Sequence, residues 1–70
     1  MQKQEITTDF IKLDSFLKLC GLCQTGGGAK MAISEGLVFV NDEVCTMRGK
    51  KLYNKDKVSF EGEDFEVIKN

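Results

Sequence analysis

This chain is organised around the segment Gln24-Thr25-Gly26-Gly27-Gly28-Ala29-Lys30 and the helix and strand that follow it. Thr25 is a good N-cap, because its hydroxyl can accept a hydrogen bond from a free backbone N–H of the first helical turn. The three glycines after it cover no backbone. This turn should therefore expose bare N–H groups at the positive end of the helix dipole. The stretch predicts a helix from about Gly26 to Glu35 whose start faces an anion.

The residues behind this helix start continue the pattern. Ala29, Ala32 and Ile33 recur at helical spacing, as the buried face of a helix requires. Gly36 is placed to end the helix as its C′ residue. The apolar run Leu37-Val38-Phe39-Val40 then predicts a short strand.

A second helix is predicted before the glycine-rich stretch. Leu13, Phe16, Leu17 and Cys20 form an apolar stripe at helical spacing, and Gly21 follows as a terminator. Only a few residues separate the two predicted helices, so we expect them to pack as neighbours.

The remaining segments predict a small sheet. Residues 1–5 are polar and are expected to fray, whereas the β-prone residues 6–11 are expected to form a strand. The pair Asn41-Asp42 predicts a hairpin turn. Alternation on both sides of Gly62-Glu63 predicts a terminal hairpin. We expect an α+β fold in which two tandem helices pack on one face of a small antiparallel sheet, as a single domain over residues 1–70 with its core at about 5–68.

Length and composition set limits on the class of protein. Seventy residues with 41% hydrophobic and 30% charged side chains are typical of one small globular domain. No apolar run approaches the ~20 residues of a membrane-spanning helix, and no signal-peptide pattern is present. Three cysteines make a poor disulfide framework. We therefore expect a cytoplasmic protein.

The motifs that suggest catalysis or metal binding are incomplete. Cys20-Gly21-Leu22-Cys23 has redox spacing, but Cys20 closes a helix, at the end where the dipole does not favour a thiolate. A zinc site needs four ligands, and the chain adds only Cys45 and no histidine. The glycine run does not match a phosphate loop, because Gly27 stands where the motif has lysine. These observations predict no enzymatic activity, no cofactor and no metal.

Charge is unevenly distributed along the second half of the chain. The whole protein carries a net charge of −1, but residues 44–57 hold five basic residues and one acid, whereas residues 58–70 hold four acids and one lysine. The loop Arg48-Gly49-Lys50-Lys51 suits contact with phosphate groups. Tyr53 lies two residues later, as either a base-stacking ring or the edge of the core. A random solvated face is the alternative to this interpretation.

The order of these parts resembles a known family. The segments Ile11-Lys12-Leu13-Asp14-Ser15-Phe16-Leu17-Lys18, Thr25-Gly26-Gly27-Gly28-Ala29-Lys30 and Gly36-Leu37-Val38-Phe39-Val40-Asn41-Asp42-Glu43 are similar to the alpha-L RNA-binding motif, also called the S-four domain after the fourth protein of the small ribosomal subunit. The basic loop and the short chain are similar to its stand-alone bacterial branch, the YaaA/YbcJ-like proteins. Asp42 departs from the family pattern, which has glycine at that position of the turn.

This resemblance implies a non-enzymatic module that binds structured RNA, often ribosomal or transfer RNA, in ribosome assembly or translation. A protein–protein adaptor that docks a partner through the acidic C-terminal hairpin is the alternative. Carried over position by position, the resemblance implies RNA contacts by residues of both helices and the basic loop, to which the residue analysis adds Tyr53. The full set is Lys12, Lys18, Gln24, Thr25, Gly26, Gly27, Gly28, Lys30, Arg48, Lys50, Lys51 and Tyr53.

Overall fold

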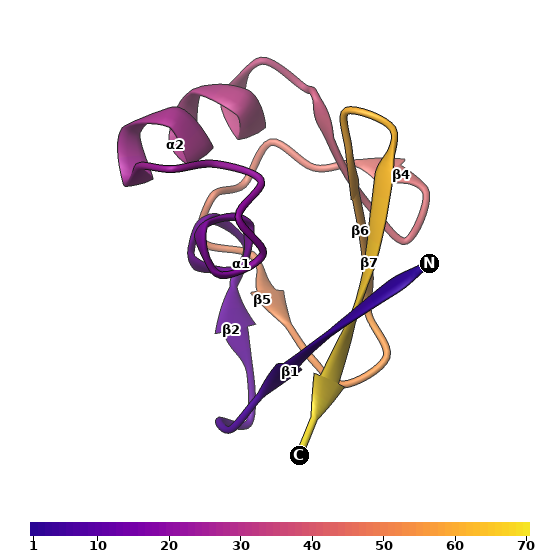
Figure 1. Cartoon of the computed structure of the whole chain (residues 1–70). Helices are drawn as coiled ribbons and strands as arrows, with labels where there is room; N and C mark the ends of the chain where they lie inside the picture. Colours follow the sequence, from indigo (N-terminus) through magenta and orange to yellow (C-terminus); the bar gives the residue numbers. More distant parts are fainter.

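Two helices cover one face of a five-stranded sheet in the computed structural model, which describes residues 1–70 (Figure 1). The strand order in this sheet is β1-β7-β6-β3-β4, and β2 and β5 form a separate two-stranded sheet. The α+β class and the tandem helices are therefore confirmed. The elements in chain order are β1 (Gln2–Ile6), β2 (Ile11–Lys12), α1 (Leu13–Leu19), α2 (Gly26–Ser34), β3 (Val38–Val40), β4 (Glu43–Val44), β5 (Lys51–Leu52), β6 (Lys57–Phe60) and β7 (Glu63–Lys69).

Helix α1 forms where the apolar stripe predicted it. Leu13, Phe16 and Leu17 are fully buried, and Cys20 packs against the core at the C-cap. Gly21 follows with a φ of 76°. The N–H of Gly21 donates to the carbonyl of Lys18 at 3.1 Å. A second bond, from Leu22 to Leu17, completes a Schellman motif, which satisfies carbonyl groups that the helix leaves free.

Helix α2 ends in the same way. The N–H of Gly36 donates to Ile33, and the N–H of Leu37 donates to Ala32, each at 3.1 Å. Gly36 has a φ of 76°, which a residue without Cβ adopts at no steric cost. The helix stops at Ser34, one residue before the predicted end, and Glu35 is its C-cap. The paired Schellman motifs keep both helices short and turn the chain back toward the core.

The sheet is mixed, which corrects the prediction of an antiparallel sheet. Residues 2–6, expected to fray for the most part, form β1, which pairs in parallel with β7. The strand predicted over 6–11 is wrong as one unit. Its chain leaves β1 at Ile6, bends through residues 7–9 and resumes as the two-residue β2. A local sequence pattern cannot reveal this pairing, because the partners lie at the two ends of the chain, as Gln4 and Val67 do.

Both hairpin turns have two residues with positive φ, as type I′ turns require. Asn41 and Asp42 have φ values of 51° and 70°, and Val40 pairs directly with Glu43. The terminal turn is Glu61-Gly62, with φ values of 51° and 80°, one residue earlier than predicted. The I′ geometry matches the right-handed twist of the flanking strands, so the chain accepts unfavourable backbone angles at Asp42 and Glu61 to keep the hairpins tight.

The core lies between the helices and the inner face of the sheet. Alternation along β6 and β7 buries Val58, Phe60, Phe65 and Val67, as the terminal hairpin pattern predicted. Leu52 of β5 is fully buried among them. No charged or polar side chain is buried, so all ionisable groups are left at or near the surface. None of the helices is long and apolar enough to cross a bilayer.

Candidate nucleic-acid interface

The start of α2 has the geometry that the sequence predicted. Thr25 is extended, with φ −131° and ψ 158°, and its side-chain oxygen accepts a hydrogen bond from the N–H of Gly28 at 3.0 Å. The N–H groups of Gly26 and Gly27 have no partner within the protein. A Cβ on either glycine would meet no atom within 4 Å. The first turn of α2 therefore presents two bare amides to open space at the positive end of the helix.

The basic loop is an ordered turn. The N–H of Lys50 donates to the carbonyl of Met47 at 3.1 Å, which closes a four-residue turn with Arg48 and Gly49 at its centre. We call residues 47–50 the basic turn. The side chains of Arg48 and Lys50 are exposed.

Two backbone hydrogen bonds dock the basic turn on the start of α1. Leu13 N–H donates to the carbonyl of Lys50 at 2.9 Å, and Asp14 N–H donates to the carbonyl of Arg48 at 3.2 Å. Helix α1 has no side-chain cap of its own, because its N-cap residue is Lys12. The carbonyl groups of the turn take the place of that cap and satisfy two of the free N–H groups at the helix start.

The cations predicted to contact RNA have no acidic partner. The two ion pairs of the structure are Lys57–Asp42, at 2.9 Å, and Lys69–Asp9, at 2.8 Å. Each pair shifts a pKa, because the carboxylate of Asp42 raises the pKa of Lys57 and the hydrogen bond from Lys69 lowers the pKa of Asp9. Both lysines lie outside the predicted set. The cations of the predicted set are all exposed and form no ion pair; they are Lys12, Lys18, Lys30, Arg48, Lys50 and Lys51.

Pairing between β2 and β5 brings two of these cations face to face. Lys12 is directly opposite Lys51 in the antiparallel register. Like charges in this arrangement repel each other, and no carboxylate is placed to neutralise them. The structure therefore concentrates positive charge at the junction of β2, β5 and the basic turn.

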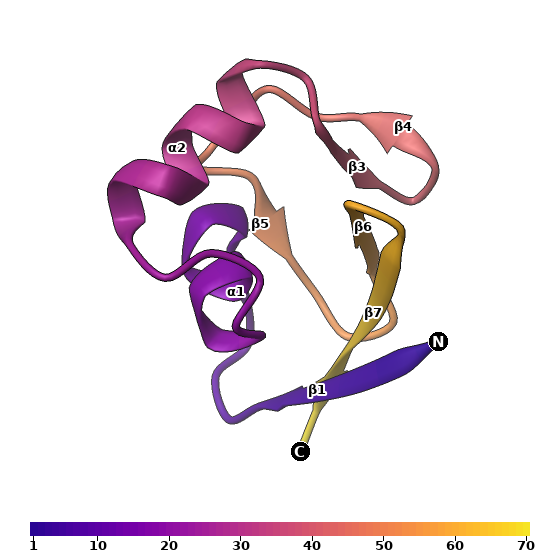
Figure 2. The same cartoon turned by 45° about the horizontal axis from the view of Figure 1, so that its top comes forward.

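The predicted set is in two parts. Backbone contacts bring Lys12, Arg48, Lys50 and Lys51 together around the start of α1. The start of α2 is separate, at the end of that helix farther from the sheet in both views (Figures 1 and 2). Lys18 and Lys30 are on the exposed surfaces of the two packed helices, and Gln24 is exposed just before Thr25.

One aromatic residue was not singled out from the sequence. Phe10 lies next to Tyr53, with ring centroids 6.1 Å apart, and the ammonium of Lys51 is 4.8 Å from the centroid of the Phe10 ring. Tyr53 is 51% exposed and is not part of the buried core. The sequence does hold a sign of this contact, because an aromatic, an aliphatic and a lysine residue follow one another in Phe10-Ile11-Lys12 and stand in the opposite order in Lys51-Leu52-Tyr53.

The three thiols lie at the edge of the core. Cys20, Cys23 and Cys45 are free, half-buried and packed against apolar residues. Burial raises the pKa of the Cys20 thiol to about 12, and burial with the nearby charge of Glu61 raises the pKa of Cys23. The structure contains no group of three or more histidine, cysteine, aspartate or glutamate side chains that could hold a metal ion.

Comparisons with known proteins agree with this architecture. The model of the S4 domain family matches residues 4–68. A "Probable ribosome maturation protein RlbA" from Bacillus subtilis (strain 168) is 48% identical over 64 residues, 90% of either chain. The "Putative RNA-binding protein YbcJ" of Escherichia coli (strain K12) is 38% identical over 58 residues, 83% of either chain.

A solved structure extends this similarity to three dimensions. The solution structure of YbcJ from E. coli, described as revealing an "alfaL motif involved in RNA-binding", matches with a TM-score of 0.74 and 33% sequence identity. The match covers 97% of this chain and 87% of that chain. These findings confirm the resemblance to the alpha-L motif that the sequence indicated.

The position of Cys20 predicts slow alkylation. At pH 8 a thiol with the ordinary pKa of 9.0 is about one-tenth thiolate, whereas a pKa of about 12 leaves about one part in ten thousand. Iodoacetamide should therefore modify Cys20 at least a hundredfold more slowly in the folded protein than in urea. Fragmentation of the tryptic peptide 19–30 by mass spectrometry separates Cys20 from Cys23. Equal rates in the folded and unfolded protein would show a reactive thiol and revive the redox interpretation.

Proposed function

This chain belongs to the S4 domain family, and we propose that it is a cytoplasmic protein that binds structured RNA and catalyses no reaction. The proposal rests on one arrangement of charged and polar groups. Four cations without ion pairs lie around the start of α1, and two backbone N–H groups at the start of α2 have no hydrogen-bond partner. Such an arrangement can bind several phosphate groups of one RNA, because both backbone N–H groups and cationic side chains bind phosphate.

The two parts of the interface have complementary roles. The N–H groups of Gly26 and Gly27 have fixed directions, so they determine where one phosphate sits. Arg48 can bind a phosphate through two parallel hydrogen bonds, whereas Lys50 and Lys51 act as point charges. Because double-stranded RNA is recognised mostly through its shape and its phosphate and 2′-hydroxyl groups, fixed donors at two separated places favour a folded RNA over a flexible strand.

Ribosomal RNA is the proposed target. The relative with 48% identity carries the name of a ribosome maturation protein. We therefore propose binding to a structured ribosomal RNA segment during assembly of the ribosome, with transfer RNA as the other structured RNA to be compared.

Acidic residues on the sheet make one side of the protein negatively charged, whereas the side around the start of α1 is positively charged. The hairpin β6–β7 carries Glu61, Glu63 and Asp64 at exposed positions, and Glu66 is half-exposed. Their charge makes the net charge slightly negative, but it repels phosphate from the sheet and leaves the helix side as the favourable approach. This is the role we assign to the hairpin. An adaptor function would instead require that these carboxylates bind a partner protein.

Removing two of the four cations around the start of α1 should change the salt dependence of RNA binding. If about three to five phosphates are neutralised, log K should fall with log salt at a slope of about −2 to −4. Arg48→Ala with Lys51→Ala should make the slope shallower by about 1 to 2, because each lost contact releases about one counterion fewer. Fluorescence anisotropy with a ribosomal RNA hairpin across a salt series measures this change.

A double variant of equal charge is the control for that experiment. Lys3 of β1 and Lys57 of β6 lie on either side of Glu66 of β7, on the face of the sheet away from the helices. Lys3→Ala with Lys57→Ala should keep the wild-type slope. If both double variants alter the slope equally, the protein attracts RNA only through its overall charge and the proposed interface is wrong.

A carboxylate at the start of α2 should compete with the phosphate. Gly27→Glu has open space for its side chain and places a negative charge where the helix dipole favours one, so the fold should be retained. RNA binding should weaken by about tenfold or more, because the carboxylate occupies the position of the anion. Gly27→Ala is the matched control and should bind like the wild type. Wild-type affinity of Gly27→Glu, with an unchanged melting temperature, would exclude this helix start from the interface.

A further inference from the structure

The two-stranded sheet β2–β5 has one face toward the core and one toward solvent. Ile11 pairs with Leu52, which is fully buried, and Ile11 packs against the same core. Side chains alternate along a strand, so the neighbouring positions point the other way. Continuing the register by one residue places Phe10 opposite Tyr53.

The outward face therefore carries two aromatic rings and two lysines. We call Phe10, Lys12, Lys51 and Tyr53 the aromatic–lysine face. Its contacts agree with the register, since the rings of Phe10 and Tyr53 are tilted by 50° at a centroid distance of 6.1 Å. Lys51 reaches diagonally across the strand pair to the Phe10 ring at 4.8 Å. The four side chains form one continuous surface beside the basic turn.

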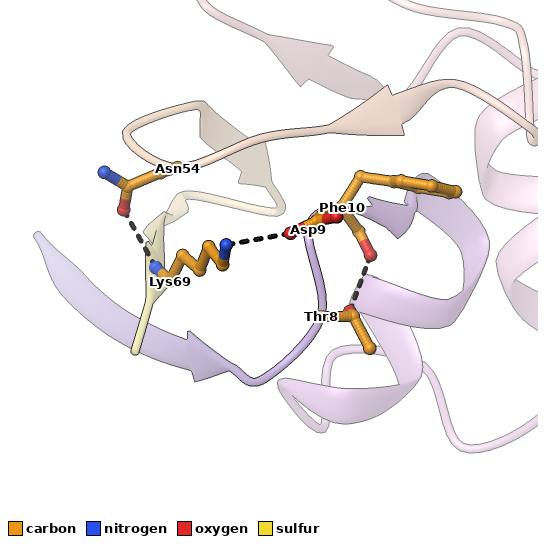
Figure 3. Close-up of polar contacts among 5 residues, drawn as sticks. All are labelled: Thr8, Asp9, Phe10, Asn54 and Lys69. Atoms are coloured by element: carbon orange, nitrogen blue, oxygen red, sulfur yellow. Dashed lines mark hydrogen bonds and ion pairs between the residues drawn. The ribbon is translucent and has the colours of Figure 1, made fainter.

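Hydrogen bonds from Lys69 hold the two aromatic segments in place (Figure 3). Its backbone N–H donates to Asn54 Oδ1, next to Tyr53, and its Nζ donates to Asp9 Oδ1, next to Phe10, both at 2.8 Å. One residue of β7 thus connects the loop before β2 to the turn after β5.

Each of the two aromatic segments also has hydrogen bonds between its own residues. Thr8 Oγ1 donates to the carbonyl of Phe10 at 2.7 Å. Asp56 Oδ2 accepts from the N–H of Tyr53 at 2.7 Å, and the N–H of Asp56 donates to the carbonyl of Tyr53 at 3.0 Å. Hydrogen bonds within the protein therefore hold the backbone that carries both rings. A surface prepared in this way loses little conformational entropy when it binds.

We propose that the aromatic–lysine face is a stacking platform for one unpaired RNA base, so that the preferred RNA has an unpaired nucleotide next to its duplex. This inference rests on the proposed function, in which the adjoining basic turn contacts phosphates. Tyr53 offers a half-exposed ring on which a base can stack. Proteins that recognise particular RNA sites commonly stack unpaired bases on aromatic side chains.

The lysines explain why the ligand is a nucleotide and not an apolar side chain of a protein partner. Lys12 and Lys51 are opposite each other without a carboxylate between them. A phosphate next to a stacked base would neutralise that repulsion. An apolar partner would bury both ammonium groups without compensation, which is costly. Rings beside free cations are the combination found in single-strand binding surfaces.

The test compares three RNA hairpins with the same stem. One is blunt, one has an unpaired adenosine as a bulge, and one has it as a 3′ overhang, with 2-aminopurine in place of the unpaired adenosine in a parallel set. The wild type should bind the bulged or the overhanging hairpin about tenfold more tightly than the blunt one, since stacking of one base has about this effect. Bound 2-aminopurine should lose fluorescence as it stacks.

Variants of Tyr53 locate the effect. Tyr53→Leu should reduce the ratio of affinities for the bulged and the blunt hairpin to about one, whereas Tyr53→Phe should keep the wild-type ratio. Phe39→Leu is the matched control, because Phe39 is 40% exposed on the far face of the sheet and should not matter. Melting temperatures verify that each variant is folded.

The possible results distinguish failure of the stacking platform from failure of RNA binding as a whole. If the wild type binds all three hairpins equally, or if Tyr53→Leu retains the preference, the platform does not exist although the protein binds RNA. If no hairpin binds even at low salt, RNA binding itself fails and the platform fails with it.

Discussion

Two backbone hydrogen bonds, from Leu13 N–H to Lys50 O and from Asp14 N–H to Arg48 O, fix the position of the basic turn. They exist because α1 begins without a side-chain cap, so its free N–H groups need acceptors from elsewhere in the chain. The buried side chains of Phe16 and Leu17 hold α1 in the core. Core packing of α1 therefore determines where the backbone of the basic turn lies, and with it the exposed side chains of Arg48 and Lys50.

The protein shows how a chain with a net charge of −1 can present a cationic surface. Its ion pairs use Lys57 and Lys69, whereas the cations around the start of α1 have none. The acids of the β6–β7 hairpin are too far away to form ion pairs with them. Local arrangement, and not net charge, thus decides which side of a small protein can attract a polyanion.

The features that the sequence predicts correctly depend on residues close together in the chain. The cap formed by Thr25, the terminator Gly36 and the buried stripe of α1 each depend on residues a few positions apart, and all three are present. The parallel pairing of β1 with β7 joins the two ends of the chain, so no window of sequence contains it. The docking of the basic turn on α1 and the contact of Phe10 with Tyr53 were missed for the same reason. The geometry of the candidate site thus depends on tertiary contacts, although its residue types could be read from the sequence.

In the proposed function, RNA approaches the side of the protein that carries the helices and not the acidic hairpin. An NMR titration of the isotope-labelled protein with a structured ribosomal RNA hairpin can locate the RNA, because each backbone amide gives its own signal. We predict the largest shift changes at the amides of Gly26 and Gly27 and of residues 48–51, with little change at residues 61–66. Changes concentrated at residues 61–66, with the signals of the glycine amides unmoved, would show that RNA binds the hairpin and not the helix side.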